Sequence, residues 1–159
     1  MLNQCTSHDG PYNSTLFASF PFTRSSAGAT SDPLAGTWST AQLTESQVVR
    51  AYVAAGGAEK DGHEVFAAQH FLVVILKFDN GLFTETQSRD GGAPEVGNTG
   101  TYTVDNREFL LHAGSCTETF GYDLTGDVLQ LRYLNPICPD DGHPIGQTLY
   151  TGFPFTRST

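Results

Sequence analysis

From Gly36 onward, apolar residues alternate with polar ones in short segments that are separated by turn residues. Alternation at a period of two is typical of strands with one buried face. The Asn-Gly pair at residues 80–81 lies between two apolar segments, and it indicates a hairpin because both residues tolerate positive φ. The predicted strands are residues 36–43, 71–78, 82–88, 98–104, 108–112, 116–124, 128–134 and 147–157.

The pattern changes to a helical one between the first two predicted strands. Thr44 and Gln47 have the spacing of a capping box, and the glycines at 56–57 end the helix that follows. Residues 61–70 predict a second helix. The apolar stripe at helical spacing in the first helix consists of Val48, Val49, Tyr52 and Val53.

The order of these elements predicts how the strands are arranged. Short hairpins can join only antiparallel strands, and eight such strands close into an up-and-down barrel that has no exposed edge. We therefore predict a mainly β fold: an eight-stranded antiparallel up-and-down closed barrel with one or two short helices between strands one and two. An open two-sheet sandwich is the alternative.

The chain also contains an internal repeat. Residues 1–25 align without a gap with residues 134–158, ten positions are identical, and the six residues 20–25 recur as 153–158. We interpret 1–25 as a repeat of the final strand region that ends a preceding similar domain, 26–32 as a linker and 33–159 as the barrel domain. Alternatively, the duplicated strand pairs with a barrel edge or exchanges with the last strand in a swapped homodimer.

Charge and hydropathy narrow the choice of partners. The chain has 8 Lys+Arg against 17 Asp+Glu, and its net charge of −9 disfavours binding to nucleic acid or to an anionic membrane surface. No apolar run is long enough to insert into a membrane. The N-terminus has no signal-peptide pattern, which indicates a cytoplasmic protein unless the chain is a piece of a longer, exported parent.

Residues on the first and last predicted strands of the barrel carry a family resemblance. Gly36-Thr37-Trp38 resembles the Gly-x-Trp signature of lipocalins and their calycin relatives. The resemblance implies that Trp38 plugs the closed end and that Arg157, on the last strand, packs across the indole as a structural pair. Such a cation–π contact contributes on the order of 1 kcal/mol. The helical insertion is more similar to fatty-acid-binding proteins, in which a helix pair covers the open end.

The cysteines allow two interpretations. Cys116 opens the sixth predicted strand and Cys138 lies in the loop before the last one, so a barrel could bring them together in a disulfide. Three free thiols in a reducing compartment are the alternative. Neither cysteine has metal-ligand spacing, and no phosphate or dinucleotide motif is present, so we expect no metal and no cofactor.

The alternating faces suggest a ligand site. If the aromatic faces point inward, a small, mostly apolar molecule would bind in the barrel under a lid formed by residues 44–55. If they do not, the acidic residues lie in water and aromatic rings fill the interior. The predicted ligand-binding residues are Tyr52, Phe66, Phe83, Glu85, Tyr102, Phe120 and Tyr122.

Two further functions stay open beside the binding of a small hydrophobic molecule. A cyclase-type enzyme could use the cavity to shape a hydrophobic substrate, with Glu85, Glu118 and Tyr122 as polarising or proton-transferring groups. A non-catalytic structural or adhesion repeat module would need no open cavity. Because no catalytic motif is present, the sequence favours a ligand-binding domain over an enzyme.

Overall fold

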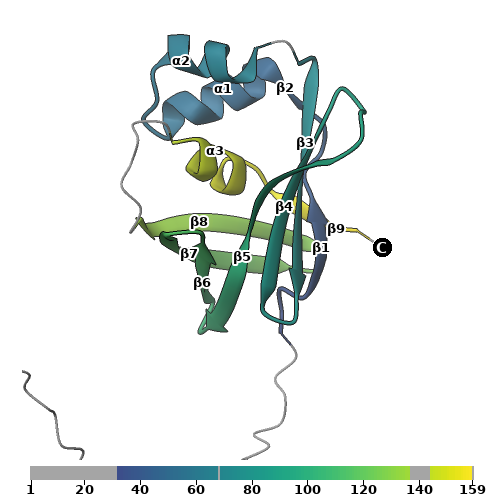
Figure 1. Ribbon diagram of the computed structural model, residues 1–159, viewed down its shortest axis with the longest axis vertical. Helices are drawn as coiled ribbons and strands as arrows, with labels where there is room; N and C mark the ends of the chain where they lie inside the picture. Colours follow the sequence, from purple (N-terminus) through teal and green to yellow (C-terminus); the bar gives the residue numbers. More distant parts are fainter. Residues whose placement is uncertain (1–31, 68, 137–143, 159) are drawn as a thin grey trace, which may run out of the picture. The chain divides into compact units, whose positions relative to one another are not determined.

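Antiparallel strands form a closed barrel in the computed structural model, which describes residues 32–67, 69–136 and 144–158 (Figure 1). Each strand pairs with its neighbours in the order β1-β9-β8-β7-β6-β5-β4-β3-β2, and β1 also pairs with β3, which closes the sheet on itself. The elements are β1 (Gly36–Ser39), β2 (Leu43–Thr44), α1 (Glu45–Ala54), α2 (Glu59–Phe66), β3 (Phe71–Asp79), β4 (Leu82–Arg89), β5 (Glu95–Asp105), β6 (Glu108–Ala113), β7 (Cys116–Thr125), β8 (Val128–Pro136), α3 (Ile145–Thr151) and β9 (Phe155–Arg157).

The predicted first strand is present but interrupted. Both β1 and β2 pair with β3, and Thr40 bridges the gap between them. The backbone N–H of Thr40 donates to the carbonyl of Val74, and the N–H of Val74 donates to Thr40 Oγ1 at 3.1 Å. Counting β1 and β2 as one strand gives eight strands, so the predicted eight-stranded antiparallel closed barrel is confirmed.

The local signals between β1 and β4 also formed the predicted structures. Thr44 caps α1 by accepting from the N–H of Gln47, while the Gln47 side chain accepts from the N–H of Thr44 at 2.8 Å. Asn80 and Gly81 both have positive φ in the β3–β4 hairpin. The second helix begins and ends earlier than the predicted range 61–70. Among the described residues, no helix is long and apolar enough to cross a bilayer.

The predicted last strand, 147–157, is wrong over its first half. Residues 145–151 form the helix α3, and only Phe155–Arg157 form the strand β9. The hydroxyls of Thr148 and Thr151 donate to the carbonyls four residues earlier, a bond that only a helical turn allows. In Figure 1, α3 lies between α1 and the barrel strands. This end of the barrel, covered by the three helices, is called the helical end below.

The inward faces are the aromatic ones. The Phe78 ring contacts the rings of Phe83, Tyr102 and Phe109, with centres 4.9–5.6 Å apart. These rings and the aliphatic side chains of β3 and β8 form one core cluster that continues into the helices. The alternative in which the acidic residues of β4 face water is therefore wrong for Glu85, which lies in this interior.

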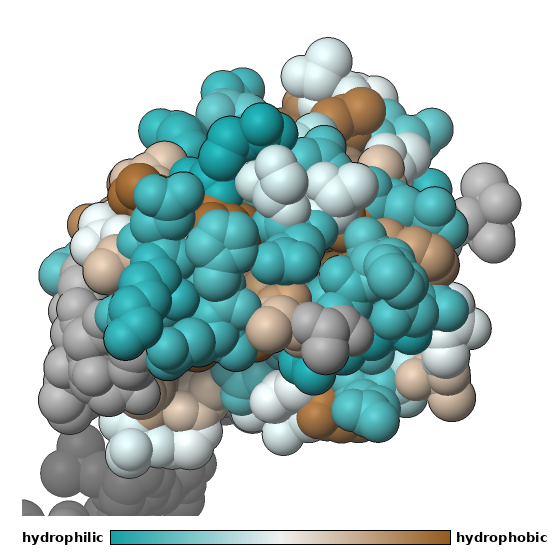
Figure 2. All heavy atoms as spheres, turned by 90° about the horizontal axis from the view of Figure 1, so that it is seen from above, coloured by the Kyte–Doolittle hydropathy of each residue, from teal (hydrophilic) through white to brown (hydrophobic). Residues whose placement is uncertain are grey.

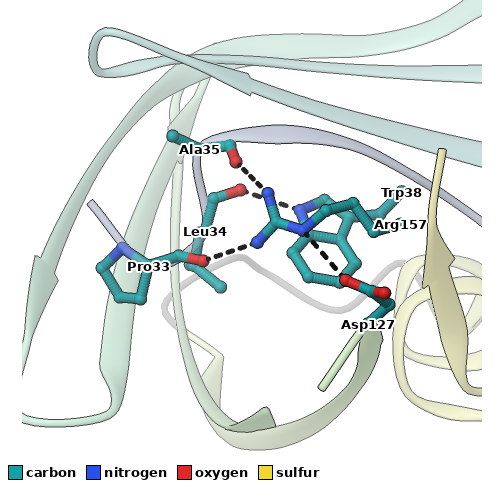
Figure 3. Close-up of polar contacts among 6 residues, drawn as sticks. All are labelled: Pro33, Leu34, Ala35, Trp38, Asp127 and Arg157. Carbon is teal, nitrogen blue, oxygen red and sulfur yellow. Dashed lines mark hydrogen bonds and ion pairs between the residues drawn. The ribbon is translucent and has the colours of Figure 1, made fainter. Parts of the chain in front are cut away.

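The opposite end, called the closed end, is shut by the segment before β1. Trp38 pairs in register with Arg157, and the guanidinium carbon lies 4.1 Å from the centre of the indole ring (Figure 3). Arg157 also donates to the carbonyls of Ala35 and Pro33, and the indole N–H donates to Leu34 O at 2.8 Å. The predicted contact between tryptophan and arginine is confirmed, and the closed sheet is consistent with a lipocalin-like fold.

Candidate functional site

A carboxyl group is buried inside the barrel at the helical end. Glu85 points inward from β4, is 3% exposed, and its Oε1 has no hydrogen-bond partner. Burial raises the pKa of Glu85 above its ordinary value of 4.5, and a side-chain hydrogen bond with Gln87 acts in the opposite direction. Glu85 therefore holds its proton to a higher pH than an exposed glutamate, and it can donate as well as accept a hydrogen bond.

A bulge in β5 makes room for this carboxyl group. The register between β4 and β5 shifts after Glu85, which pairs with Asn98 while Thr86 pairs with Val96. Gly97 is the extra residue, and a Cβ there would overlap the Glu85 carboxylate. Because glycine has no side chain, the carboxyl group can lie directly against the β5 backbone.

The ring of Tyr150 enters the same space from α3. It is 4% exposed and lies edge-on to Phe83 and Phe120, with ring centres 6.0 and 5.7 Å away. Its hydroxyl accepts a hydrogen bond from Asn98 Nδ2 at 3.3 Å. Burial, followed by the nearby Glu85 carboxylate, raises the pKa of Tyr150, so the side chain is a neutral phenol at physiological pH.

A second carboxylate borders this space. Tyr133, on β8, donates to Glu118 Oε1 on β7 at 3.0 Å, and the Tyr133 ring lies 5.2 Å from that of Phe120. Glu118 is half-buried, and its charge also raises the pKa of Tyr150. These polar groups make one site, called the helical-end cluster. Its members are Glu85, Gln87, Asn98, Glu118, Tyr133 and Tyr150.

The structure brings only some of the predicted site residues together. Phe83, Glu85 and Phe120 meet around Tyr150, whereas two tyrosines lie toward the closed end. The Tyr102 hydroxyl donates to Asp32, and its N–H donates to a carbonyl of the β3–β4 turn. Burial raises the pKa of Tyr122, and the nearby Asp32 charge adds to this.

Tyr122 also lines a hollow of about 370 Å³ outside the barrel interior. The predicted enzymatic set is thus divided between the two ends: Glu85 and Glu118 belong to the helical-end cluster, and Tyr122 does not. The residues that line the hollow are Pro33, Arg107, Tyr122, Asp123, Leu124 and Thr125.

The remaining predicted contacts lie between the two helices of the insertion. Tyr52 of α1 and Phe66 of α2 are buried, and their rings meet edge to face with centres 6.0 Å apart. Gly57 allows this packing, because a Cβ there would overlap the Tyr52 ring. Figure 2, a view of the helical end, shows a mostly hydrophilic surface with apolar residues in small separate areas. A role for Tyr52 and Phe66 in contacting a ligand stays a prediction.

Sequence reasoning missed Tyr150, Tyr133 and Asn98 as members of the site. Tyr150 was assigned to a strand, although Pro154 in the same range was a signal against one long strand. Tyr133 and Asn98 were placed on strands, but their contacts depend on register and on α3. No local pattern carries that information.

Within the described ranges, no group of three or more His, Cys, Asp and Glu side chains is placed to hold a metal ion. Cys138 lies outside the described residues, so its predicted disulfide with Cys116 stays a prediction. Comparison with protein-family models, curated proteins and solved structures found no match to the chain.

Proposed function

We propose that this domain is a distant lipocalin-like barrel of the calycin type that binds a small, mostly apolar molecule at its helical end. In this proposal, the molecule carries one hydrogen-bonding group, which Glu85 recognises. The single observation that carries the proposal is the buried Oε1 of Glu85. This atom lies among aromatic side chains and has no hydrogen-bond partner.

A purely structural core would not favour such a group. A buried polar atom without a partner costs about 1–3 kcal/mol, and more when it is charged. An apolar residue of similar size at position 85 would avoid that cost. Residues that weaken a fold in this way are typical of functional sites, so Glu85 supports a ligand-binding role.

The surroundings of Tyr150 indicate the chemistry of the ligand. The ring of Tyr150 has aromatic edges on two sides, and its hydroxyl meets Asn98. Tyr150 lies near enough to Glu85 for that carboxylate to raise its pKa, so we expect a ligand that reaches Glu85 to displace the Tyr150 ring. A molecule with an aromatic or similarly flat apolar body and one carbonyl, hydroxyl or amine group would make equivalent contacts.

An enzymatic function is the second candidate, and the raised pKa of Glu85 favours it. A carboxyl group whose pKa is raised by burial holds its proton to a higher pH and can act as a general acid, and the second carboxylate, Glu118, borders the same space. In such an enzyme Glu85 and Glu118 would keep their predicted roles. Tyr122, toward the closed end, would not act with them.

A structural or adhesion repeat module is the third candidate, and the aromatic packing of the interior favours it. The ligand-binding proposal ranks above it because a module gains nothing from a buried acid. The two differ in one measurable property. Only the binding proposal requires that the space beside Glu85 accepts a small molecule.

Binding of Nile red, a neutral fluorescent apolar dye, tests this property on the full chain. Tyr150→Ala removes the ring that fills the space, so we expect its dye affinity to be about tenfold higher than that of the unchanged chain. In that background, Glu85→Leu should reverse the gain. Glu108→Leu, which changes an exposed glutamate of β6, should leave it intact.

Tyr52→Ala is the matched control, since it removes an equally buried tyrosine from the α1–α2 contact. If Tyr52→Ala raises dye affinity as much as Tyr150→Ala does, the dye reports general loosening, and the proposal fails. Native mass spectrometry of the purified full chain adds a second measurement. It would detect a co-purified small molecule and the mass loss of the predicted disulfide.

A further inference from the structure

Two acidic side chains of the helical-end cluster have no basic partner among the described residues. Glu85 and Glu118 take part in none of the ion pairs that these residues form. Both carboxylates raise the pKa of Tyr150, and no positively charged group in the described part of the chain acts against them there. As far as the structure describes it, the cluster therefore holds two acids and no base.

The two oxygens of the Glu85 carboxyl group differ in their surroundings. A Cβ at Gly97 would overlap Oε2 most closely, so this oxygen lies against the β5 backbone. The buried Oε1 has no hydrogen-bond partner, although Gln87 bonds to the carboxyl group. A buried carboxylate is stable only when donors or a cation compensate it, and Oε1 is free to receive such a group.

Aromatic rings border the space that a ligand would take from Tyr150. The Tyr150 ring lies edge-on to Phe83 and Phe120, and Phe120 lies beside Tyr133, with ring centres 5.2 Å apart. Aromatic rings attract cations through their π faces, most strongly where water is excluded. Rings and carboxylates together make a site whose chemistry suits a positively charged group.

We propose that the ligand of the helical-end cluster is an organic cation, in which an apolar body carries one ammonium group that pairs with Glu85. This inference rests on the ligand-binding function proposed above and narrows it to amines. The ammonium group would donate to Glu85 Oε1, and the charge of Glu118 and the rings beside Tyr150 would add to the attraction. A neutral alcohol could satisfy Oε1 as well, but it would not compensate the charge of Glu118.

The helices that cover this end also favour cations. Together, α1 and α2 carry four acidic residues against two of lysine and arginine. The whole chain has a net charge of −9. Such a field raises the local concentration of positively charged molecules and repels anions. The covering helices and the site itself thus select the same charge.

An ammonium ligand predicts a characteristic pH dependence of binding. A bound cation favours the ionised form of Glu85, so the affinity should rise with pH until Glu85 is ionised in the free protein, and then level off. The other titratable groups around Glu85 are Glu118 of β7, Tyr133 of β8, whose hydroxyl donates to Glu118, and Tyr150 of α3. Tyr150 stays neutral because burial raises its pKa, so Glu118 is the group that has to be tested separately.

The test compares three probes that share a phenyl ring on a short chain: phenethylamine, phenethyl alcohol and hydrocinnamate. Isothermal titration calorimetry of the full chain with Tyr150→Ala, which removes the ring beside Glu85, measures their affinities between about pH 5 and pH 8, where an alkylamine keeps its proton as lysine does. We expect the amine to bind about tenfold more tightly than the alcohol at the upper end of this range, and the anion to bind least. The unchanged chain should show the same order at lower affinity.

Three substitutions in the Tyr150→Ala background assign the charge. Glu85→Gln should lower the affinity for the amine to about that of the alcohol and remove its rise with pH, while Glu118→Gln should cause a smaller loss and keep the rise. Glu108→Gln, at an exposed position of β6, is the matched control and should change neither. Equal affinities for amine and alcohol, or an unaltered preference for the amine with Glu85→Gln, overturn the inference and leave the binding site in place. If neither amine nor alcohol binds to either chain, the proposed function fails with it.

Discussion

At the closed end of the barrel, the buried indole N–H of Trp38 and the half-buried guanidinium of Arg157 donate to protein carbonyls, whereas at the helical end Glu85 Oε1 has no partner. Both ends have a similar aromatic lining. This difference indicates which end of the barrel stabilises the fold and which end is available for binding. Polar groups that are paired add stability and hold the ends of the sheet together, while a buried carboxyl oxygen without a partner weakens the fold and is available to bind another group.

The two ends also differ in what closes them. At the closed end, the residues before β1 lie under the barrel, and Asp32 accepts hydrogen bonds from Leu34 N–H and from the Tyr102 hydroxyl. At the helical end, closure depends on the seven residues of α3, whose N-cap residue Pro144 makes no side-chain capping bond. We therefore expect changes at the closed end to affect folding and changes at the helical end to affect binding.

The largest effect should come from Trp38→Ala. Trp38 is completely buried, and truncation of such a side chain costs about 3–5 kcal/mol. The loss includes the indole N–H bond to Leu34 and the contact with Arg157. Urea unfolding measures this loss. It is followed by circular dichroism, because the substitution removes the only tryptophan and with it the fluorescence signal. Trp38→Phe, which keeps an aromatic ring, should lose less. A loss below about 1 kcal/mol for Trp38→Ala would contradict the assignment of the closed end as the stabilising one.

The second largest effect should be a gain in the free energy of unfolding. Glu85→Gln should increase the free energy of unfolding by about 1–3 kcal/mol at pH 8, because a carboxylate buried without a full set of partners is removed. The raised pKa means that the folded state binds this proton more tightly than the unfolded state does. Stability therefore falls as pH rises from the unfolded value near 4.5 to the folded pKa of Glu85, and stays low above it.

Urea unfolding across this pH range measures the difference. The gain from Glu85→Gln should vanish below the unfolded pKa, where the carboxyl group is protonated in both states. Glu108→Gln, at an exposed position, should show no comparable trend. An equal gain at low and high pH would rule out the charge as the cause.

The contrast between the two ends also explains what the sequence could predict. The strands, the α1 cap and the Asn80–Gly81 hairpin follow from neighbouring residues, because alternation and turn chemistry are local. The pair Trp38 and Arg157 was identified from a family resemblance and from the position of each residue at one end of the barrel. The closed end was therefore largely predictable.

The helical end was not, and α3 is the reason. Residues 145–151 include two threonines and a tyrosine, which favour a strand, and a helix of seven residues is not stable alone. Packing against α1 and the barrel decides its structure, and that packing involves residues far away in the sequence. The sequence identified Glu85 as a candidate site residue. Its unpaired oxygen and its contact with β5 depend on a bulge that no short sequence pattern predicts.

The smallest predicted effect concerns a single hydrogen bond at the helical end, between Tyr150 and Asn98. Tyr150→Phe removes only the hydroxyl that accepts from Asn98, so we expect a loss of about 0.5–1.5 kcal/mol in the free energy of unfolding. A double-mutant cycle with Asn98→Ala isolates this bond from the other contacts of the amide, which also accepts from the Thr99 N–H. The coupling should account for most of the loss. Zero coupling would mean that the hydroxyl matters through Glu85 and not through Asn98, and the Tyr150→Phe loss should then disappear in a Glu85→Gln background.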